Sequence, residues 1–267
     1  SMEMDAGGGW VDAGAGAQDA GPSVQAAGVP TPDAGPHPCV ARARDVPGVQ
    51  RTQQGNRVTL NNFPSTHLQN TRRITVLLPP GDGPFPVLYA HDGQNLFDPS
   101  TAFAGQEWEL DETAAQLWSQ GTRFIVVGID NNADRMSEYT PVSDPSYGGG
   151  NGDAYLRFVL DEVKPYVDFH FSTRCQPEHT AMMGSSLGGL ISFHAGRTRH
   201  DTVGRIGALS PSFWWNNRWT LTQYNAQQQR NPVILWLDAG TDENSPRNRS
   251  LDSVVRNMRD IRDRAMA

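Results

Sequence analysis

The stretch "MMGSSLGGLISFHAG", residues 182–196, decides the fold. Residues 179–184 have the apolar pattern of a buried strand, and the residues after Ser186 have apolar side chains at helical spacing. Ser186 lies between the two, framed by Gly184 and Gly188 in a G-x-S-x-G pattern. The pattern alone also occurs by chance in turns without chemistry, but the strand–turn–helix setting favours a nucleophile elbow. Ser186 is therefore the candidate nucleophile.

The sequence around this elbow alternates short β-rich runs with helical patterns. Strands are expected at 57–60, 73–79, 86–91, 124–130, 179–184, 205–210 and 233–240. Helices are expected over 107–121 and 153–171, and the second begins at an Asp suited to capping. Near-continuous apolar strands with right-handed crossovers predict an α/β fold with a doubly wound, mostly parallel sheet. Ligands should bind at the carboxyl ends of its strands.

Composition excludes several classes of function. The chain of 267 residues has a net charge of −7, which gives no footprint for binding nucleic acid. Its apolar runs are much shorter than the roughly twenty residues that a transmembrane helix needs. We expect no metal, because His, Cys and carboxylates are not clustered at ligand spacing. We also expect no cofactor, because neither a G-x-G-x-x-G nor a P-loop frame is present.

The first part of the chain differs from the rest. Residues 1–38 repeat Asp, Ala, Gly and Pro with few large apolar side chains, which predicts a disordered tether before a single domain at 39–267. Such spacers often follow an export signal or a lipid anchor, so we expect an exported protein, whether secreted, periplasmic or surface-tethered. Cys39 and Cys175 are the two cysteines, and a disulfide between them would suit an oxidising compartment. Two unpaired thiols are the alternative.

Oxyanion donors are expected on both sides of the elbow. The Leu187 N–H begins the predicted helix and points toward a developing oxyanion. A second donor, the N–H of Gly93 or Gln94, is expected in the loop "HDGQNLFDPS" after the strand at 86–91. His91 begins this loop on the oxyanion side, so we interpret it as structural or substrate-lining rather than as a base.

The acidic member of a triad should follow a later strand. In "VILWLDAGTDEN" a glycine followed by a carboxylate three residues later points to Glu243, and Asp242 is the close alternative.

Five motifs, in this order, together resemble a known family: "VLYAHDGQNLFD", "VVGIDNNADRMSEYTP", "MMGSSLGGLISFHAG", "GALSPSFWW" and "LDAGTDE". They are similar to the esterase family of α/β-hydrolase fold, which includes enterochelin esterases, feruloyl and acetylxylan esterases, S-formylglutathione hydrolases and mycolyltransferases. The resemblance covers about residues 55–245. It implies Ser186 as nucleophile, Glu243 as acid and the backbone donors named above. It also implies that Trp214 and Trp215 border the acyl or alcohol pocket, with plain core packing as the alternative.

The chain departs from this family at the histidine. In such enzymes the histidine follows the acid, yet no histidine follows Glu243. We therefore expect the final strand, the histidine loop and the last helix to be missing from this sequence, with an amphipathic helix over 251–261 as its last element. The sheet edge so exposed would allow a homo-oligomer, and a partner chain could then supply the histidine. All seven histidines precede the acid, and none has the expected position: 37, 67, 91, 170, 179, 194 and 200.

The predicted activity is ester hydrolysis through an acyl-enzyme. Small-molecule esters or acyl esters linked to polysaccharide, such as acetyl or feruloyl esters, are the expected substrates, followed by siderophore lactones. The alternative is a catalytically dead fragment or carbohydrate-binding pseudoenzyme that lacks the triad histidine. Without that base, the 267 residues alone should have esterase activity near background.

Overall fold

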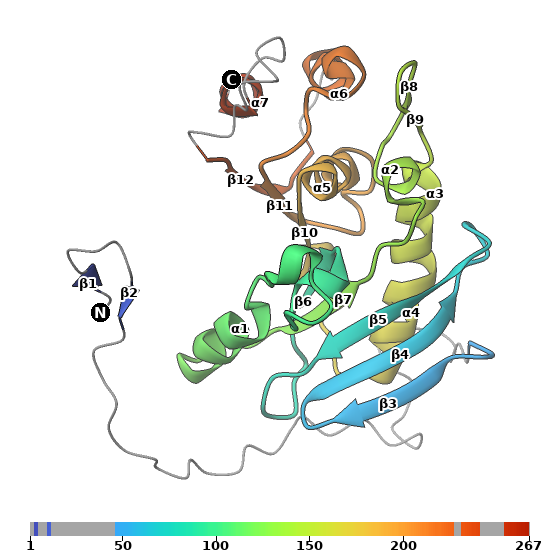
Figure 1. The fold of residues 1–267 in the computed structure, drawn as a ribbon, viewed down its shortest axis with the longest axis vertical. Helices are drawn as coiled ribbons and strands as arrows, with labels where there is room; N and C mark the ends of the chain where they lie inside the picture. The colour runs from blue at the N-terminus through green and yellow to red at the C-terminus, as the bar shows by residue number, and fades with distance from the viewer. Residues whose placement is uncertain (1–2, 5–9, 12–45, 227–230, 241–253, 267) are drawn as a thin grey trace.

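A computed structural model describes residues 3–4, 10–11, 46–226, 231–240 and 254–266 (Figure 1). Two short strands, β1 (Glu3–Met4) and β2 (Trp10–Val11), pair antiparallel. The rest of the predicted tether lies outside the described residues.

An eight-stranded sheet forms the centre of the domain, in the order β12-β11-β10-β6-β7-β5-β4-β3. The strands from β12 to β7 are parallel to their neighbours, whereas β5, β4 and β3 pair antiparallel. The mostly parallel α/β fold is thus confirmed, as are the seven predicted strands. The eight strands, of which β3 was not predicted, are β3 Gln50–Gln54, β4 Arg57–Pro64, β5 Thr71–Leu77, β6 Val87–His91, β7 Ile125–Ile129, β10 Thr180–Ser185, β11 Arg205–Leu209 and β12 Ile234–Asp238.

Helices cover both faces of this sheet. On one face, α1 (Leu110–Ser119) packs Ala114 and Trp118 against a small cluster that includes Leu77 and Val126. The other face carries the larger core, to which α5 (Leu187–Thr198), α6 (Trp215–Ala226) and α7 (Val254–Met266) contribute. Because neighbouring residues of a strand point to opposite faces, β7 supplies Val126 to the small cluster and Val127 to the large one. This two-sided burial explains the continuous apolar runs in the sequence.

The helix predicted at 153–171 is a continuous stack of three segments on the larger-core face. It consists of α3 (Gly152–Arg157), a π-helical turn η3 (Phe158–Val163) and α4 (Lys164–His170). The predicted Asp cap is wrong: Asn151 is the N-cap residue, and it makes no side-chain capping hydrogen bond. Asp153 Oδ1 instead lies 2.8 Å from His194 Nε2 of α5, a tertiary contact that competes with capping.

Short elements line the carboxyl edge of the sheet and the loops near it. They are η1 (Gly93–Asn95), η2 (Phe103–Gly105), α2 (Arg135–Glu138), β8 (Ser143–Asp144) and β9 (Gly148–Gly149), whereas η4 (Pro177–His179) precedes β10 at the opposite, amino edge. Strands β8 and β9 form a small hairpin that stands beside α6 in Figure 1.

Two further predictions concern the surface of the domain. Cys175 is disulfide-bonded, as predicted for this cysteine, while Cys39 lies outside the described residues. Strand β12 ends the sheet in the part of the chain that the structure describes, and Ile234 and Trp236 on it are 60% and 68% exposed. Association through this edge stays a prediction. Among the described helices, none is both long and apolar enough to cross a membrane.

Candidate active site

Ser186 lies at the sharp turn between β10 and α5. Its backbone has φ 58° and ψ −118°, a left-handed conformation that a residue with a Cβ rarely adopts. The turn is tight because a Cβ on Gly184 would lie only 2.8 Å from the backbone of Gly188. Glycine is therefore required at position 184, and the turn leaves the Ser186 side chain exposed. The strand–turn–helix geometry predicted for G-x-S-x-G is present.

The nucleophile candidate has a hydroxyl neighbour that the sequence analysis missed. Ser186 Oγ lies 3.1 Å from Oγ of Ser212, which is 3% exposed. The two residues are also joined by a backbone hydrogen bond of 3.0 Å from the Ser212 N–H to the Ser186 carbonyl. Ser212 lies in the quoted motif "GALSPSFWW", so the motif was the available signal, although nothing in it indicated this contact.

The backbone groups predicted as oxyanion donors begin α5 and follow β6, and their catalytic role stays a prediction. The N–H groups of Leu187, Gly93 and Gln94 have no hydrogen-bond acceptor within the described part of the chain. Gly93 lies against strand β7, because a Cβ there would come within 2.7 Å of the Gly128 carbonyl carbon. Strands β6 and β10 are neighbours in the sheet, so the loop after β6 and the elbow after β10 meet at the same edge. The arrangement leaves several N–H groups free to bind an oxyanion.

His91 lies in the core beneath this loop. The residue is 1% exposed, and its Nδ1 lies 2.8 Å from the Tyr155 hydroxyl. Its ring also packs against Tyr139, with the ring centroids 5.3 Å apart. Burial lowers the pKa of His91 to about 4, so the imidazole is neutral at neutral pH. Of the two roles considered for His91, structural or substrate-lining, its burial favours the structural one.

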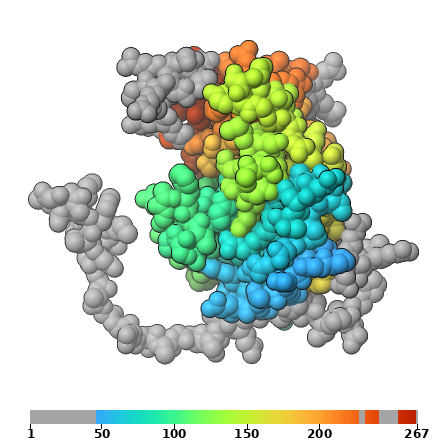
Figure 2. All heavy atoms as spheres, turned by 45° about the vertical axis from the view of Figure 1, so that its right-hand side comes forward, coloured from blue at the N-terminus to red at the C-terminus, as the bar shows by residue number. Residues whose placement is uncertain are grey.

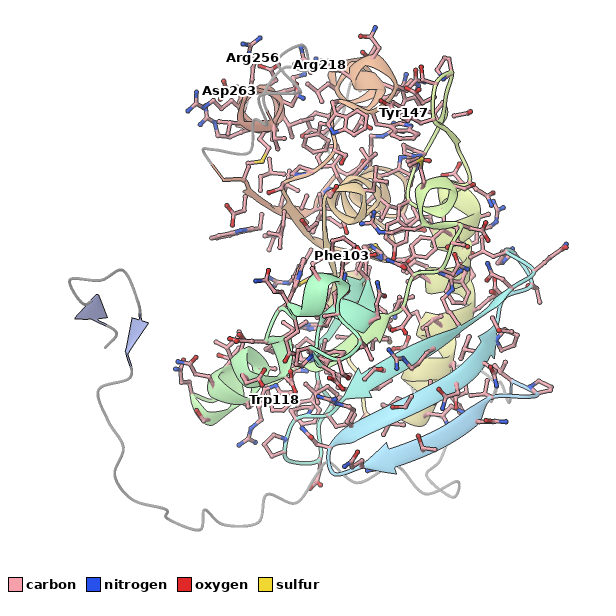
Figure 3. The ribbon with its side chains drawn as sticks, viewed as in Figure 1. Phe103, Trp118, Tyr147, Arg218, Arg256 and Asp263 are labelled. Carbon is pink, nitrogen blue, oxygen red and sulfur yellow. The ribbon has the colours of Figure 1, made fainter. Side chains whose placement is uncertain are left out.

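The two tryptophans differ in their surroundings. Trp215 is 1% exposed, and its indole N–H donates to the Val142 carbonyl at 2.7 Å, so it anchors the β8–β9 hairpin. Trp214 is half-buried, and its ring centroid lies 6.1 Å from that of Tyr147 in an edge-on arrangement. Tyr147 is 58% exposed and lies on the hairpin close to α6 (Figure 3). Trp214 and Tyr147 thus form an accessible aromatic pair.

The predicted acid, Glu243, and its alternative, Asp242, lie outside the described residues. The preceding strand β12 ends at Asp238, whose carbonyl accepts the Ser210 N–H at 2.6 Å. The chain therefore leaves the sheet beside the segment that carries Ser212.

The described histidines do not hydrogen-bond to the serine at the elbow. Ser186 Oγ contacts only Ser212 among the described residues. His194, two helical turns after Ser186, lies in the core and bonds with Asp153 instead. His37 lies outside the described residues.

Comparison with known proteins agrees with this α/β fold. The model of the Esterase family matches residues 65–263, and the chain belongs to this family. It is 32% identical to the YbbA protein of Bacillus subtilis over 73% of this chain and 76% of that protein. It is 31% identical to the siderophore triacetylfusarinine C esterase of Aspergillus fumigatus, over 51% of this chain and 47% of that enzyme.

Solved structures show the same fold. The siderophore hydrolase EstA from Aspergillus nidulans superposes with a TM-score of 0.57 and 25% identity, covering 79% of this chain and 78% of that one. The expected family and α/β fold are confirmed, and the protein is a hydrolase that acts on carboxylic esters.

Proposed function

We propose that Ser186 is the nucleophile of this esterase. The observation that carries the proposal is an exposed serine in a strained left-handed turn, next to backbone N–H groups that have no acceptor in the described residues. Such a turn lifts the hydroxyl out of the sheet, where an ester carbonyl can reach it. The N–H groups of Leu187 and of Gly93 or Gln94 then bind the oxyanion of the tetrahedral intermediate.

The reaction proceeds in two steps. Ser186 Oγ attacks the ester carbonyl, loses its proton to a base, and the alcohol leaves to give an acyl-enzyme. The base gives this proton to the leaving alcohol, and water then attacks the acyl group, so that the carboxylic acid is released and the serine is regenerated. Glu243, or Asp242, orients the base. This assignment is supported by the position of the end of β12, which lies at the same edge of the sheet as the elbow. We assign the base to none of the described histidines, because none contacts Ser186 Oγ.

Siderophore esters are the substrate class that we propose. The names of two similar proteins support this choice, since one is a siderophore triacetylfusarinine C esterase and the other a siderophore hydrolase. The accessible pair of Tyr147 and Trp214 offers two aromatic rings, set edge to face, for contact with a bulky ligand. Acyl esters of carbohydrates, the class that the sequence favoured, are the competing candidate, because aromatic side chains also stack on sugars.

We also propose that the protein works outside the cytoplasm. The support is the disulfide at Cys175, since disulfides persist in oxidising compartments. Fractionation of the native host, with detection of the protein in each fraction, tests the location. Recovery in the cytoplasmic fraction alone would contradict it.

A substrate panel tests the proposed activity. The full-length protein and its Ser186→Ala variant are incubated with ferric triacetylfusarinine C, enterobactin, acetylated xylan and methyl ferulate, and products are identified by mass spectrometry. We expect siderophore hydrolysis by the wild type and none by the variant. Preferential release of acetate or ferulate would support the carbohydrate class instead. No turnover of any ester by a folded wild-type protein would support a pseudoenzyme.

A further inference from the structure

One motif of the sequence has no part in the proposed chemistry. It is "VVGIDNNADRMSEYTP", residues 126–141, which contains the end of β7 and the whole of α2. In Figure 2 the yellow-green atoms of the chain after β7 form a continuous ridge on the surface, between the cyan strands and the orange α6. Several polar side chains of this motif turn inward and meet the loop after β6.

Two side chains of this motif, Arg135 and Asn131, bind the carboxylate of Asp92 in the loop after β6. Arg135 holds it with two hydrogen bonds, from Nε to Oδ1 at 2.7 Å and from Nη2 to Oδ2 at 2.8 Å. Asn131 Nδ2 donates a third hydrogen bond to Oδ1 at 2.6 Å. The Asp92 side chain is only 8% exposed and that of Arg135 is 30% exposed, so the pair is partly shielded from water. A bidentate arginine fixes both the position and the orientation of a carboxylate.

Asp92 is also the residue that sets the path of the oxyanion loop. Its backbone is left-handed, with φ 58° and ψ 45°, and it directly precedes Gly93 and Gln94. An aspartate pays a conformational cost in this region, so its surroundings must hold it there. Its N–H donates to the Tyr139 hydroxyl at 3.2 Å, which fixes the backbone from the other side.

The same motif holds the loop at a second point. The backbone N–H of Asn131 donates to Gln94 Oε1 at 3.0 Å. The loop in turn lies against the first turn of α5, because a Cβ on Gly188 would come within 3.5 Å of Asp92 Oδ2. The Arg135–Asp92 pair therefore lies between α2 and the helix that begins at the elbow.

We propose that Arg135 is a positioning residue for catalysis, which acts through Asp92 to hold the Gly93 and Gln94 N–H groups where the oxyanion forms. The inference rests on the proposed role of Ser186. An oxyanion donor is effective only within about 2.7–3.1 Å of the developing charge. A displacement of the loop by about 1 Å can lower the rate by up to about a hundredfold. Arg135 contributes to the rate without touching the substrate.

Two other roles of Arg135 predict different kinetics. If the guanidinium attracted an anionic substrate, its loss would leave both kcat and KM for an uncharged ester unchanged. If only its positive charge mattered, lysine would replace it, because lysine keeps the charge but lacks the planar fork. A positioning role predicts a lower kcat at nearly constant KM, and little recovery with lysine.

The test uses the full-length protein and p-nitrophenyl acetate, an uncharged ester. The variants are Arg135→Lys, Arg135→Ala, Asp92→Asn and the double variant Arg135→Ala/Asp92→Asn. The matched control is Arg199→Ala, which removes a comparable ion pair with Asp161 (2.6 Å, Arg199 24% exposed) between α5 and η3. Each variant is checked for folding by circular dichroism and thermal unfolding.

We expect both Arg135 variants to lower kcat by about 10- to 100-fold with KM changed less than about twofold, and Arg199→Ala to keep wild-type kinetics. The double variant should lose little more than either single variant, since both break one contact. Guanidinium chloride at non-denaturing concentration should partly restore kcat of Arg135→Ala only.

Three results would overturn the inference: a folded Arg135→Ala enzyme with wild-type kcat, full activity in Arg135→Lys, or a change confined to KM. Ser186→Ala, measured alongside, separates this inference from the proposed function. If Ser186→Ala kept its activity, the nucleophile would be wrong. If it lost activity while Arg135 variants did not, only the positioning role would fail.

Discussion

Acidification should destabilise the protein through His91. Its pKa is lowered from 6.5 to about 4, chiefly because burial disfavours the charged ring, with Arg135 acting in the same direction and Asp92 opposing it. The Tyr155 and Tyr139 rings enclose the imidazole and offer no charge to compensate a proton. The unfolded chain therefore binds a proton at this position more readily than the folded protein does.

The sign and size of the effect follow from linkage. Because the folded pKa lies below the unfolded one, the stability contribution of neutral His91 is complete above about pH 6.5 and is lost as the pH falls toward 4. One pKa unit corresponds to about 1.4 kcal/mol, so the total loss is about 3 kcal/mol, most of it incurred by about pH 4.5. This is a large fraction of the stability of a typical domain.

Urea unfolding, followed by tryptophan fluorescence, measures this loss at several values between about pH 7.5 and 4.5. The control is His91→Asn, which has no titrating ring and whose side-chain oxygen lies close to the position of Nδ1. We expect the free energy of unfolding of the wild type to fall by roughly 2–3 kcal/mol more than that of the variant over this range. Parallel pH profiles for the two proteins would refute the reasoning, since other groups titrate equally in both.

Two further predictions concern buried contacts. Glu138→Gln should lower the free energy of unfolding by about 3–5 kcal/mol, because it leaves the Arg72 guanidinium, 1% exposed, without its carboxylate at 2.8 Å. Asp161→Asn, in a more exposed ion pair, should cost less than about 1 kcal/mol by the same urea titration, and equal costs would contradict the argument. Gly184→Ala should abolish ester hydrolysis, because its Cβ would lie 2.8 Å from the backbone of Gly188. A folded Gly184→Ala enzyme with wild-type kcat would show that the turn is not tight.

Apolar patterning was sufficient to predict most of the sheet. The central parallel strands β6 and β7 are buried on both faces, so each is a short apolar run between turn residues. Strand β3 was missed because its sequence, "QRTQQ", has no apolar residue. It pairs at the edge of the sheet and is held there by backbone hydrogen bonds to β4. Backbone hydrogen bonds do not require apolar side chains, so the sequence pattern did not indicate this strand.

The elbow was predictable because its constraints are local, whereas its surroundings are not. Gly184 is required by a contact within one turn, since a Cβ there would lie 2.8 Å from the backbone of Gly188, and the sequence displays this glycine. Ser212 lies 26 positions from Ser186, and Arg135 lies 43 positions from Asp92, so only folding brings each pair together. The wrong capping prediction at Asp153 has the same origin, since its partner is 41 positions away.

The central claim, that Ser186 is the nucleophile, is tested most directly by covalent labelling. The full-length native protein is treated with a fluorophosphonate, digested and mapped by tandem mass spectrometry, with Ser186→Ala and Ser212→Ala in parallel. We predict phosphonylation at Ser186 both in the native protein and in Ser212→Ala. Ser186→Ala should show neither this label nor ester hydrolysis. A label on Ser212 or elsewhere, or undiminished turnover by a folded Ser186→Ala protein, would contradict it.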